Sequence, residues 1–272
     1  MRRRPAVLAL LLLAAACGGG GGTTPSPSAS PSPTRPTTDV TLWFVGDTPL
    51  GFRLFPEAHA IDAPGDVALS ALRALVDDGL RPDDPDLASP WAEAASSVIS
   101  IGRRDTTATI DLRYGRLNVG AEAEALAIAQ LVRTVASADP TIEAVTLLVD
   151  GEPIESLAGH VDASLPFPVA GTDTALATVW ISEPREGATI AGDLSFGGEA
   201  CTFEAAVPWQ VLRGGEVVAS GTALAAEACP ARTSWRVDVG ALPPGRYVLR
   251  VYDLSARDGS LIAEDTTTVT VA

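Results

Sequence analysis

The stretch "EALAIAQLVRTVASADPTIEAVTLLVDG", residues 124–151, combines a helical pattern with a strand pattern in one short span. The apolar residues of its first half recur at the spacing of one buried helix face: Ile128, Leu131, Val132 and Val135. Pro140 then ends the helical period, and "EAVTLLV" is an apolar run typical of a buried strand. Asp150 and Gly151 close that strand with a dipeptide that tolerates the positive φ of a tight turn. A helix that leads directly into a strand predicts an α+β domain.

The residues upstream extend this prediction to a mixed sheet with two helices. "VTLWFV" (40–45) and "FRLFPEAHAI" (52–61) are expected strands, and residues 97–113 are expected to form two more around "RRD". "DVALSALRALVDDG" (66–79) has a helical apolar stripe, with Asp66 suited to the N-cap and Gly79 to the stop.

From residue 176 onward no long helical period remains, and short alternating strands are separated by turn signals. The patterns in "SWRVDV" (234–239) and "RYVLRVYDL" (246–254) favour a two-sheet sandwich of the immunoglobulin kind. The clearest expected strand is "CTFEAAVPWQV" (201–211). Its alternate residues are expected on one inward face: Cys201, Phe203, Ala205, Val207, Trp209 and Val211.

The N-terminus "MRRRPAVLALLLLAAAC" (1–17) has the layout of an export signal, and its apolar run is too short to span a membrane. Small residues precede Cys17, as in lipoprotein signals. We therefore expect Cys17 to become the mature N-terminus and to carry fatty acyl chains, such as palmitate, in the cell membrane. Ordinary secretion with a spare thiol is the alternative. Residues 18–38, rich in Gly, Pro, Ser and Thr, are expected to form a disordered tether.

Two resemblances agree with this organisation. "VTLWFV", "ALRALVDDGL", "TATIDL" and "VTLLVDGEPIESLAG" make residues 39–160 similar to the GerMN domain of sporulation and spore germination proteins. Residues 176–272, through "ISEPREGATIAGDLSFGGEACTFEAAVPWQV" and "PPGRYVLRVYDLSARDGS", resemble the immunoglobulin-like domain that often follows it. Residues 161–175 are left as a linker. The resemblance implies an envelope protein of the extracytoplasmic face without known catalysis.

Cys201 and Cys229 make an even pair in an exported domain, where an oxidising compartment favours a disulfide. A bridge over this separation is expected to stabilise the fold by about 3–4 kcal/mol. Two free buried thiols are the alternative. A metal site is not expected, because the cysteines and histidines lack ligand spacing.

Candidate catalytic residues are absent from the sequence pattern. His59 and His160 stand alone, and no nucleophile elbow, phosphate loop or zinc-protease motif is present. No cofactor is therefore expected. One loop is rich in aspartate: Asp77, Asp78, Asp83, Asp84 and Asp86. These carboxylates could bind calcium, but a solvated acidic loop without a metal is the simpler interpretation.

Charge narrows the range of partners. The formal net charge is −15, which disfavours binding to nucleic acid. The leading interpretation is a non-catalytic membrane-anchored lipoprotein that binds an envelope protein or assembles in the envelope. A receptor for a small ligand or a cell-wall glycan is the second, and it would need an exposed aromatic side chain such as Trp91 in its loop. An enzyme is the third.

Overall fold

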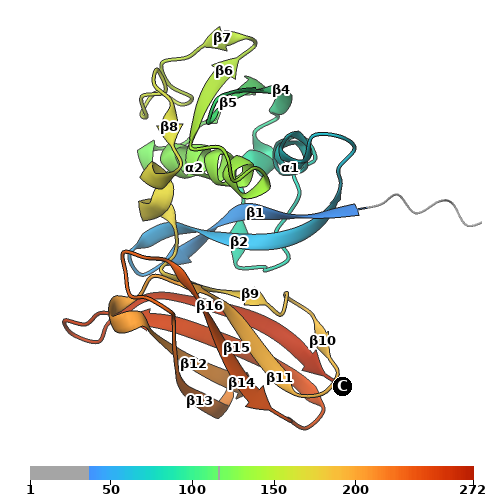
Figure 1. Cartoon of the computed structure of the whole chain (residues 1–272), viewed down its shortest axis with the longest axis vertical. Coiled ribbons are helices and arrows are strands. Elements are labelled where there is room, and N and C mark those ends of the chain that lie inside the picture. Colours follow the sequence, from blue (N-terminus) through green and yellow to red (C-terminus); the bar gives the residue numbers. More distant parts are fainter. Residues whose placement is uncertain (1–36, 116) are drawn as a thin grey trace, which may run out of the picture. The chain divides into compact units, whose positions relative to one another are not determined.

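The computed structural model describes residues 37–115 and 117–272, and these described residues belong to one compact unit (Figure 1). The expected signal, Cys17 and most of the expected tether lie outside the described residues. Within the described ranges, no helix has both the length and the apolar character that crossing a membrane requires.

A long hairpin opens the first domain. β1 (Thr37–Thr48) and β2 (Gly51–Asp62) pair antiparallel over their whole length, and β3 (Leu87–Ala88) pairs with the other edge of β1. β1 begins two residues inside the expected tether. Because side chains alternate along a strand, β1 faces two cores: Leu42 and Phe44 enter one, and Trp43 enters another.

Both predicted helices form, and the first begins and ends at its predicted caps. α1 (Val67–Val76) begins at Asp66, whose carboxylate accepts a hydrogen bond from the Leu69 N–H at 3.1 Å. It ends where Gly79 adopts a φ of +57°, and the Leu80 N–H donates to the Ala74 carbonyl at 2.9 Å. α2 (Ala121–Ala138) buries the stripe predicted from the sequence.

A mixed sheet covers these helices. β4 (Ser97–Arg104) pairs antiparallel with β5 (Thr107–Arg113), and β6 (Ala144–Val149) lies parallel to β5. Parallel neighbours need a crossover, and α2 supplies it. β7 (Glu152–Pro153) follows the Asp150–Gly151 turn. In Figure 1 the helices lie between this sheet and the β1–β2 hairpin, which confirms the α+β expectation.

The segment expected to be a linker, 161–175, carries structure of its own. β8 (Phe167–Pro168) pairs with β6, and the Val169 N–H donates to the Glu143 carbonyl at 2.8 Å. The 3₁₀ helix η2 (Ala170–Ala175) follows. Phe167 and Val169 pack against the apolar core of the first domain. Because this packing buries apolar side chains, the segment is ordered and is not a simple solvated linker.

The second domain is the expected β-sandwich. One sheet has the order β14 (Thr233–Gly240), β11 (Leu194–Ala200), β9 (Val179–Glu183). The other has the order β10 (Thr189–Ile190), β16 (Leu261–Val271), β15 (Gly245–Leu254), β12 (Ala206–Arg213), β13 (Glu216–Leu224).

Aromatic side chains fill the space between the two sheets. Phe196 lies edge-to-face between Trp209 and Trp235, at centroid distances of 5.8 and 5.7 Å. The Tyr247 hydroxyl donates to the Pro243 carbonyl at 2.7 Å, a tyrosine corner of the kind found in immunoglobulin-like domains.

The strand expected over 201–211 starts later than its alternation suggested. β12 begins at Ala206, and Phe203–Ala205 forms the 3₁₀ helix η3, in which Glu204 and Ala205 have φ of 59° and 57°. Phe203 is 64% exposed and does not share the inward face of Val207. The Cys201 N–H donates to the Thr178 carbonyl at 2.7 Å, so Cys201 continues the pairing of β11 with β9, and the chain joins β12 only after η3.

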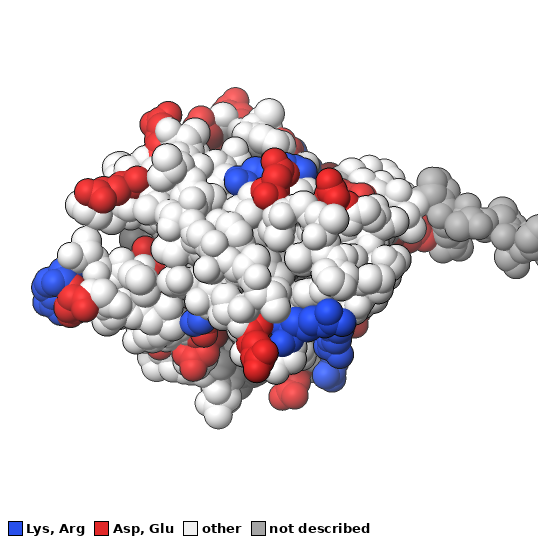
Figure 2. All heavy atoms as spheres, turned by 90° about the horizontal axis from the view of Figure 1, so that it is seen from below, with Lys and Arg blue, Asp and Glu red and all other residues white. Residues whose placement is uncertain are grey.

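Arginine and acidic side chains are interspersed on the face that Figure 2 displays, around a broad uncharged area. The arginines visible there do not gather into one basic patch.

Candidate functional site

A third apolar cluster, here called the junction core, joins the two domains. Its members come from the hairpin, from α2 and from the start of the sandwich: Trp43, Leu54, Phe55, Leu126, Ala129, Leu176, Ala177 and Trp180. The Trp43 and Trp180 rings meet edge-to-face at 5.6 Å, and the Ala177 N–H donates to the Leu54 carbonyl at 3.0 Å. Backbone pairing and apolar burial therefore both cross the domain boundary.

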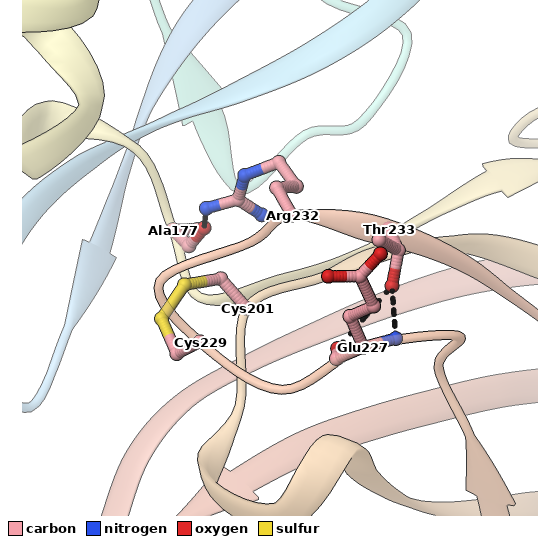
Figure 3. The surroundings of a disulfide bond; sticks show 6 residues. All are labelled: Ala177, Cys201, Glu227, Cys229, Arg232 and Thr233. Atoms are coloured by element: carbon pink, nitrogen blue, oxygen red, sulfur yellow. Dashed lines mark hydrogen bonds between the residues drawn. A yellow bond between two sulfur atoms is a disulfide. The ribbon is translucent and has the colours of Figure 1, made fainter.

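Cys201 and Cys229 form a disulfide at the edge of this junction (Figure 3), as the cysteine parity suggested. Their Cα atoms are 4.5 Å apart, and the Cys229 N–H donates to the Thr202 carbonyl at 3.1 Å. The bond ties the start of the η3 turn to the loop before β14, which also carries Arg232.

Arg232 reaches from that loop to the junction core (Figure 3). Its Nη2 donates to the Ala177 carbonyl at 2.7 Å, and its guanidinium lies 4.1 Å from the centroid of the Trp180 ring. Its Nη1 is buried and has no hydrogen-bond partner. Burial lowers the pKa of Arg232 to about 10, although the nearby charge of Glu199 opposes the shift, so the side chain remains cationic at neutral pH.

A pocket of about 420 Å³ opens beside the disulfide. Residues from the hairpin turn, the end of η2 and the sandwich line it, among them Leu50, Arg53, Leu176, Cys229, Arg232 and Ile262. Its volume falls in the range of small-molecule and peptide side-chain pockets, roughly 300–1,000 Å³. Arginine and apolar side chains together make it suited to an anionic group with an apolar neighbour.

Sequence-family comparison identifies both halves of the chain. Residues 41–155 match the family described as "Sporulation and spore germination", and residues 178–260 match the "Immunoglobulin-like domain of bacterial spore germination". The chain carries a GerMN domain followed by an immunoglobulin-like domain of bacterial spore germination. Both matches are to domains of sporulation or spore germination proteins, which supports a germination-related protein.

Solved structures similar to this chain include GerMN domains. The first GerMN domain of the sporulation protein GerM from Bacillus subtilis is 19% identical, with 48% of this chain and 98% of that chain covered and a TM-score of 0.40. The tandem GerMN domains of the same protein are 17% identical, over 52% and 48% of the two chains, with a TM-score of 0.39. A candidate lipoprotein from Clostridium perfringens is 22% identical, over 48% and 87%, with a TM-score of 0.34. No curated protein matches the chain.

A second, smaller cavity of about 110 Å³ lies where the GerMN hairpin and its acidic loop meet the immunoglobulin-like domain. Asp84 and Asp265 both line it. Burial, reinforced by neighbouring carboxylates, raises the pKa of Asp84 to about 6 and that of Asp265 to about 7, despite hydrogen bonds from backbone N–H groups.

His59 and the acidic loop meet beside that cavity. One ligand atom each of Glu57, His59 and Asp83 lies within 4.8 Å of the others. However, Glu57 already accepts hydrogen bonds from the backbone N–H groups of Asp83 and Asp84 at 2.8 and 2.9 Å, and lies 2.8 Å from His59 Nε2. These contacts account for the cluster as a support of the loop, and we assign no metal to it.

Trp91, the residue singled out for glycan stacking, is 1% exposed in the 3₁₀ helix η1 (Pro90–Glu93). Its indole N–H donates to the Ala127 carbonyl at 3.1 Å inside the GerMN core. The ring therefore lacks the exposed face that stacking on a sugar requires. The loop position could be predicted from its prolines, but the inward turn at Trp91 could not.

The sequence reasoning also missed Glu124, which is fully buried on α2. Its carboxylate accepts hydrogen bonds from the Ser156 hydroxyl and from four backbone N–H groups: Leu157, Ala158, His160 and Val161. Burial alone would raise the pKa of Glu124, but these bonds together outweigh it and hold the pKa below its ordinary value. The sequence did offer one signal: Glu124 is four residues before Ile128, so the helical spacing places this charged side chain on the buried face of α2.

His160 belongs to the loop that Glu124 holds. Its backbone N–H donates to Glu124, and its Nε2 lies 3.1 Å from the Val119 carbonyl oxygen. These contacts fit the loop-packing role expected for a lone histidine. In the described part of the chain, the two histidines are in separate surroundings.

Proposed function

We propose that this chain is a non-catalytic lipoprotein, anchored through Cys17 on the extracytoplasmic face of the cell membrane, that binds or assembles with another envelope protein during sporulation or germination. The germination-type domain pair supports the physiological setting. The export-signal pattern before Cys17 supports the anchor.

The observation that carries the binding role is the junction core. Trp43 from the GerMN hairpin and Trp180 from the immunoglobulin-like domain are 7% and 2% exposed, so the two domains share a closed apolar contact. A shared core holds two domains in one arrangement better than a flexible linker does. A partner would then meet a single preformed surface that includes residues of both domains.

Fractionation tests the anchor. Cells that express the wild-type protein should retain it in the membrane fraction, and Cys17→Ala should release it to the medium or periplasm. Metabolic labelling with a palmitate analogue should mark the wild type alone. An equally membrane-bound and equally labelled Cys17→Ala protein would refute the anchor.

Photo-crosslinking in intact cells tests the binding role. A benzophenone amino acid at position 50, on the pocket rim, should yield a discrete crosslinked species in sporulating or germinating cells. The same group at position 105, in the turn between β4 and β5, serves as a control. Absence of any product specific to position 50 and to other surface positions around the junction would count against a protein partner.

A further inference from the structure

The pocket beside the disulfide contains arginines without acidic partners. Among the described residues, neither Arg53 nor Arg232 forms a salt bridge, whereas Arg133 nearby pairs with Asp173. Within the described ranges, the Arg53 side chain donates a hydrogen bond only to the carbonyl of its neighbour Phe52, at 2.7 Å.

Arg232 is held in place but not satisfied. The Ala177 carbonyl and the Trp180 ring fix its guanidinium, while Nη1 is buried without a partner. A buried donor that lacks an acceptor is destabilising, and the loss is larger for a charged group. The fold therefore keeps a positioned, positively charged side chain at this pocket, while Nη1 itself is closed off from solvent.

Apolar side chains line the pocket together with threonines and Asp173. Leu50, Leu176, Ile262 and Ala263 line it, and the Leu50 side chain is 60% exposed at the hairpin turn. Leu50 is one of the larger exposed apolar side chains of the described chain, and it lies in the same pocket as Arg53 and Arg232. A large exposed apolar side chain beside positioned donors is a common composition of recognition sites.

We propose that this pocket binds a peptide segment of the partner protein in which a carboxylate stands beside an apolar side chain. Arg232 and Arg53 would hold the carboxylate, and Leu50 and Ile262 would cover the apolar group. A planar guanidinium matches a carboxylate through parallel hydrogen bonds. This inference rests on the proposed function, because it names the chemistry of the partner.

One carboxylate of the protein itself also lies in this pocket. Asp173 lines the pocket, and its negative charge is only partly offset by the ion pair with Arg133.

An NMR titration tests this inference. The exported protein, with labelled leucine and isoleucine methyl groups, is titrated with the peptide acetyl-Leu-Glu-Leu-amide and with acetyl-Leu-Gln-Leu-amide. We expect saturable shifts of the Leu50, Leu176 and Ile262 methyl signals with the Glu peptide. Binding of the Gln peptide should be about tenfold weaker, because one charge-assisted hydrogen-bonding pair is lost.

Variants separate the pocket from general effects. Arg53→Gln and Arg232→Gln should each remove most of the difference between the two peptides. Arg232→Lys should keep part of it, because the charge remains and the planar geometry does not. Arg236→Gln, on the exposed face of β14, is the control and should leave the difference intact.

Equal affinity for both peptides, or shifts that do not saturate, would overturn the inference. If Arg232→Gln unfolds the protein, the variant of the half-buried Arg53, Arg53→Gln, decides alone. A crosslinked partner found in cells together with a failed titration would refute the pocket and leave the proposed function standing. A positive titration together with failed membrane anchoring would refute the anchor in the proposed function and leave the pocket inference standing.

Discussion

The Trp43 and Trp180 rings lie edge-to-face, 5.6 Å apart, although one residue belongs to the first strand of the GerMN domain and the other to the first strand of the immunoglobulin-like domain. The Trp43 indole N–H also donates to the Ser137 hydroxyl at 2.9 Å, and Arg133 lies over its ring at 6.0 Å. Arg232 covers the Trp180 ring. This aromatic pair with its two arginines is the centre of the contact between the domains.

Trp180→Ala should weaken both the stability and the coupling of the domains. Removal of a buried tryptophan costs about 3–5 kcal/mol, and it leaves the Trp43 ring without its cover. We expect the single unfolding transition of the wild type, followed by urea and by calorimetry, to move to lower denaturant and to divide in two. Trp209→Ala is the matched control, because Trp209 packs against Phe196 within the sandwich alone. A Trp180→Ala protein that unfolds in one unshifted transition would contradict this assignment.

The disulfide should be a measurable source of stability. Cys201 and Cys229 are 28 residues apart, and closing a loop of that length stabilises a fold by about 3–4 kcal/mol in the chain-entropy description. The double variant Cys201→Ser/Cys229→Ser should lose an amount of this order in urea unfolding. Dithiothreitol should lower the stability of the wild type similarly and leave the double variant unchanged. Wild-type stability that is insensitive to the reductant would argue against the bond.

Glu124→Gln should release the loop of residues 155–163. The carboxylate accepts five hydrogen bonds inside the protein, and replacing it by a neutral amide leaves backbone donors poorly satisfied, at a cost of about 3 kcal/mol. Hydrogen–deuterium exchange should then increase at Leu157 and Ala158. Glu122→Gln, on the exposed side of the same helix turn, is the control and should change little.

Glu124 should also make the free energy of unfolding decrease at acid pH. Because the folded-state pKa of Glu124 lies below its ordinary value of 4.5, its contribution is complete above that value and is lost as the pH falls through the folded-state pKa. Unfolding free energies measured from pH 5 to pH 2 should decline less steeply in Glu124→Gln than in the wild type. Identical slopes would contradict the buried, ionised state.

Asp265 should act in the opposite direction. Its pKa is raised from 3.8 to about 7 by burial and by Asp84 and Glu57, so the folded protein holds a proton that the unfolded chain releases. Its contribution to stability is complete below about pH 4 and is lost as the pH rises toward 7, at about 1.4 kcal/mol for each unit of pKa difference. Asp265→Asn should flatten this decline between pH 4 and pH 8. Asp238→Asn, an exposed carboxylate on β14, should leave the decline unchanged.

Hydrophobic periodicity predicted the elements that bury one clear face. Both helices, the hairpin and the strands around Tyr247 follow from it, because local spacing and tertiary burial agree there. The strand over 201–211 was drawn too long, because alternation continues through Cys201 and Phe203 while the disulfide and the η3 turn redirect the backbone. Alternation alone does not encode positive φ at Glu204.

The candidate site was predicted only in part. The even number of cysteines in the expected exported domain indicated the disulfide, and the sequence alone was enough for this prediction. Arg232, Trp180 and Leu50 come from distant segments and share no local motif, so their convergence depends on how the domains pack. Trp91 illustrates the same limit, because its loop was visible in the sequence and its burial was not.

Because β1 contributes side chains to two apolar cores, the protein cannot be cut into separate domains without exposing one of them. The family matches end at residue 155 and resume at residue 178, and Leu176 and Ala177 between them complete the junction core with Leu54. A fragment cut at either limit would expose Trp43, Leu54 and Phe55 to water. The chain thus contains two domains that match separate families, but the two domains should be expressed and purified together as one unit.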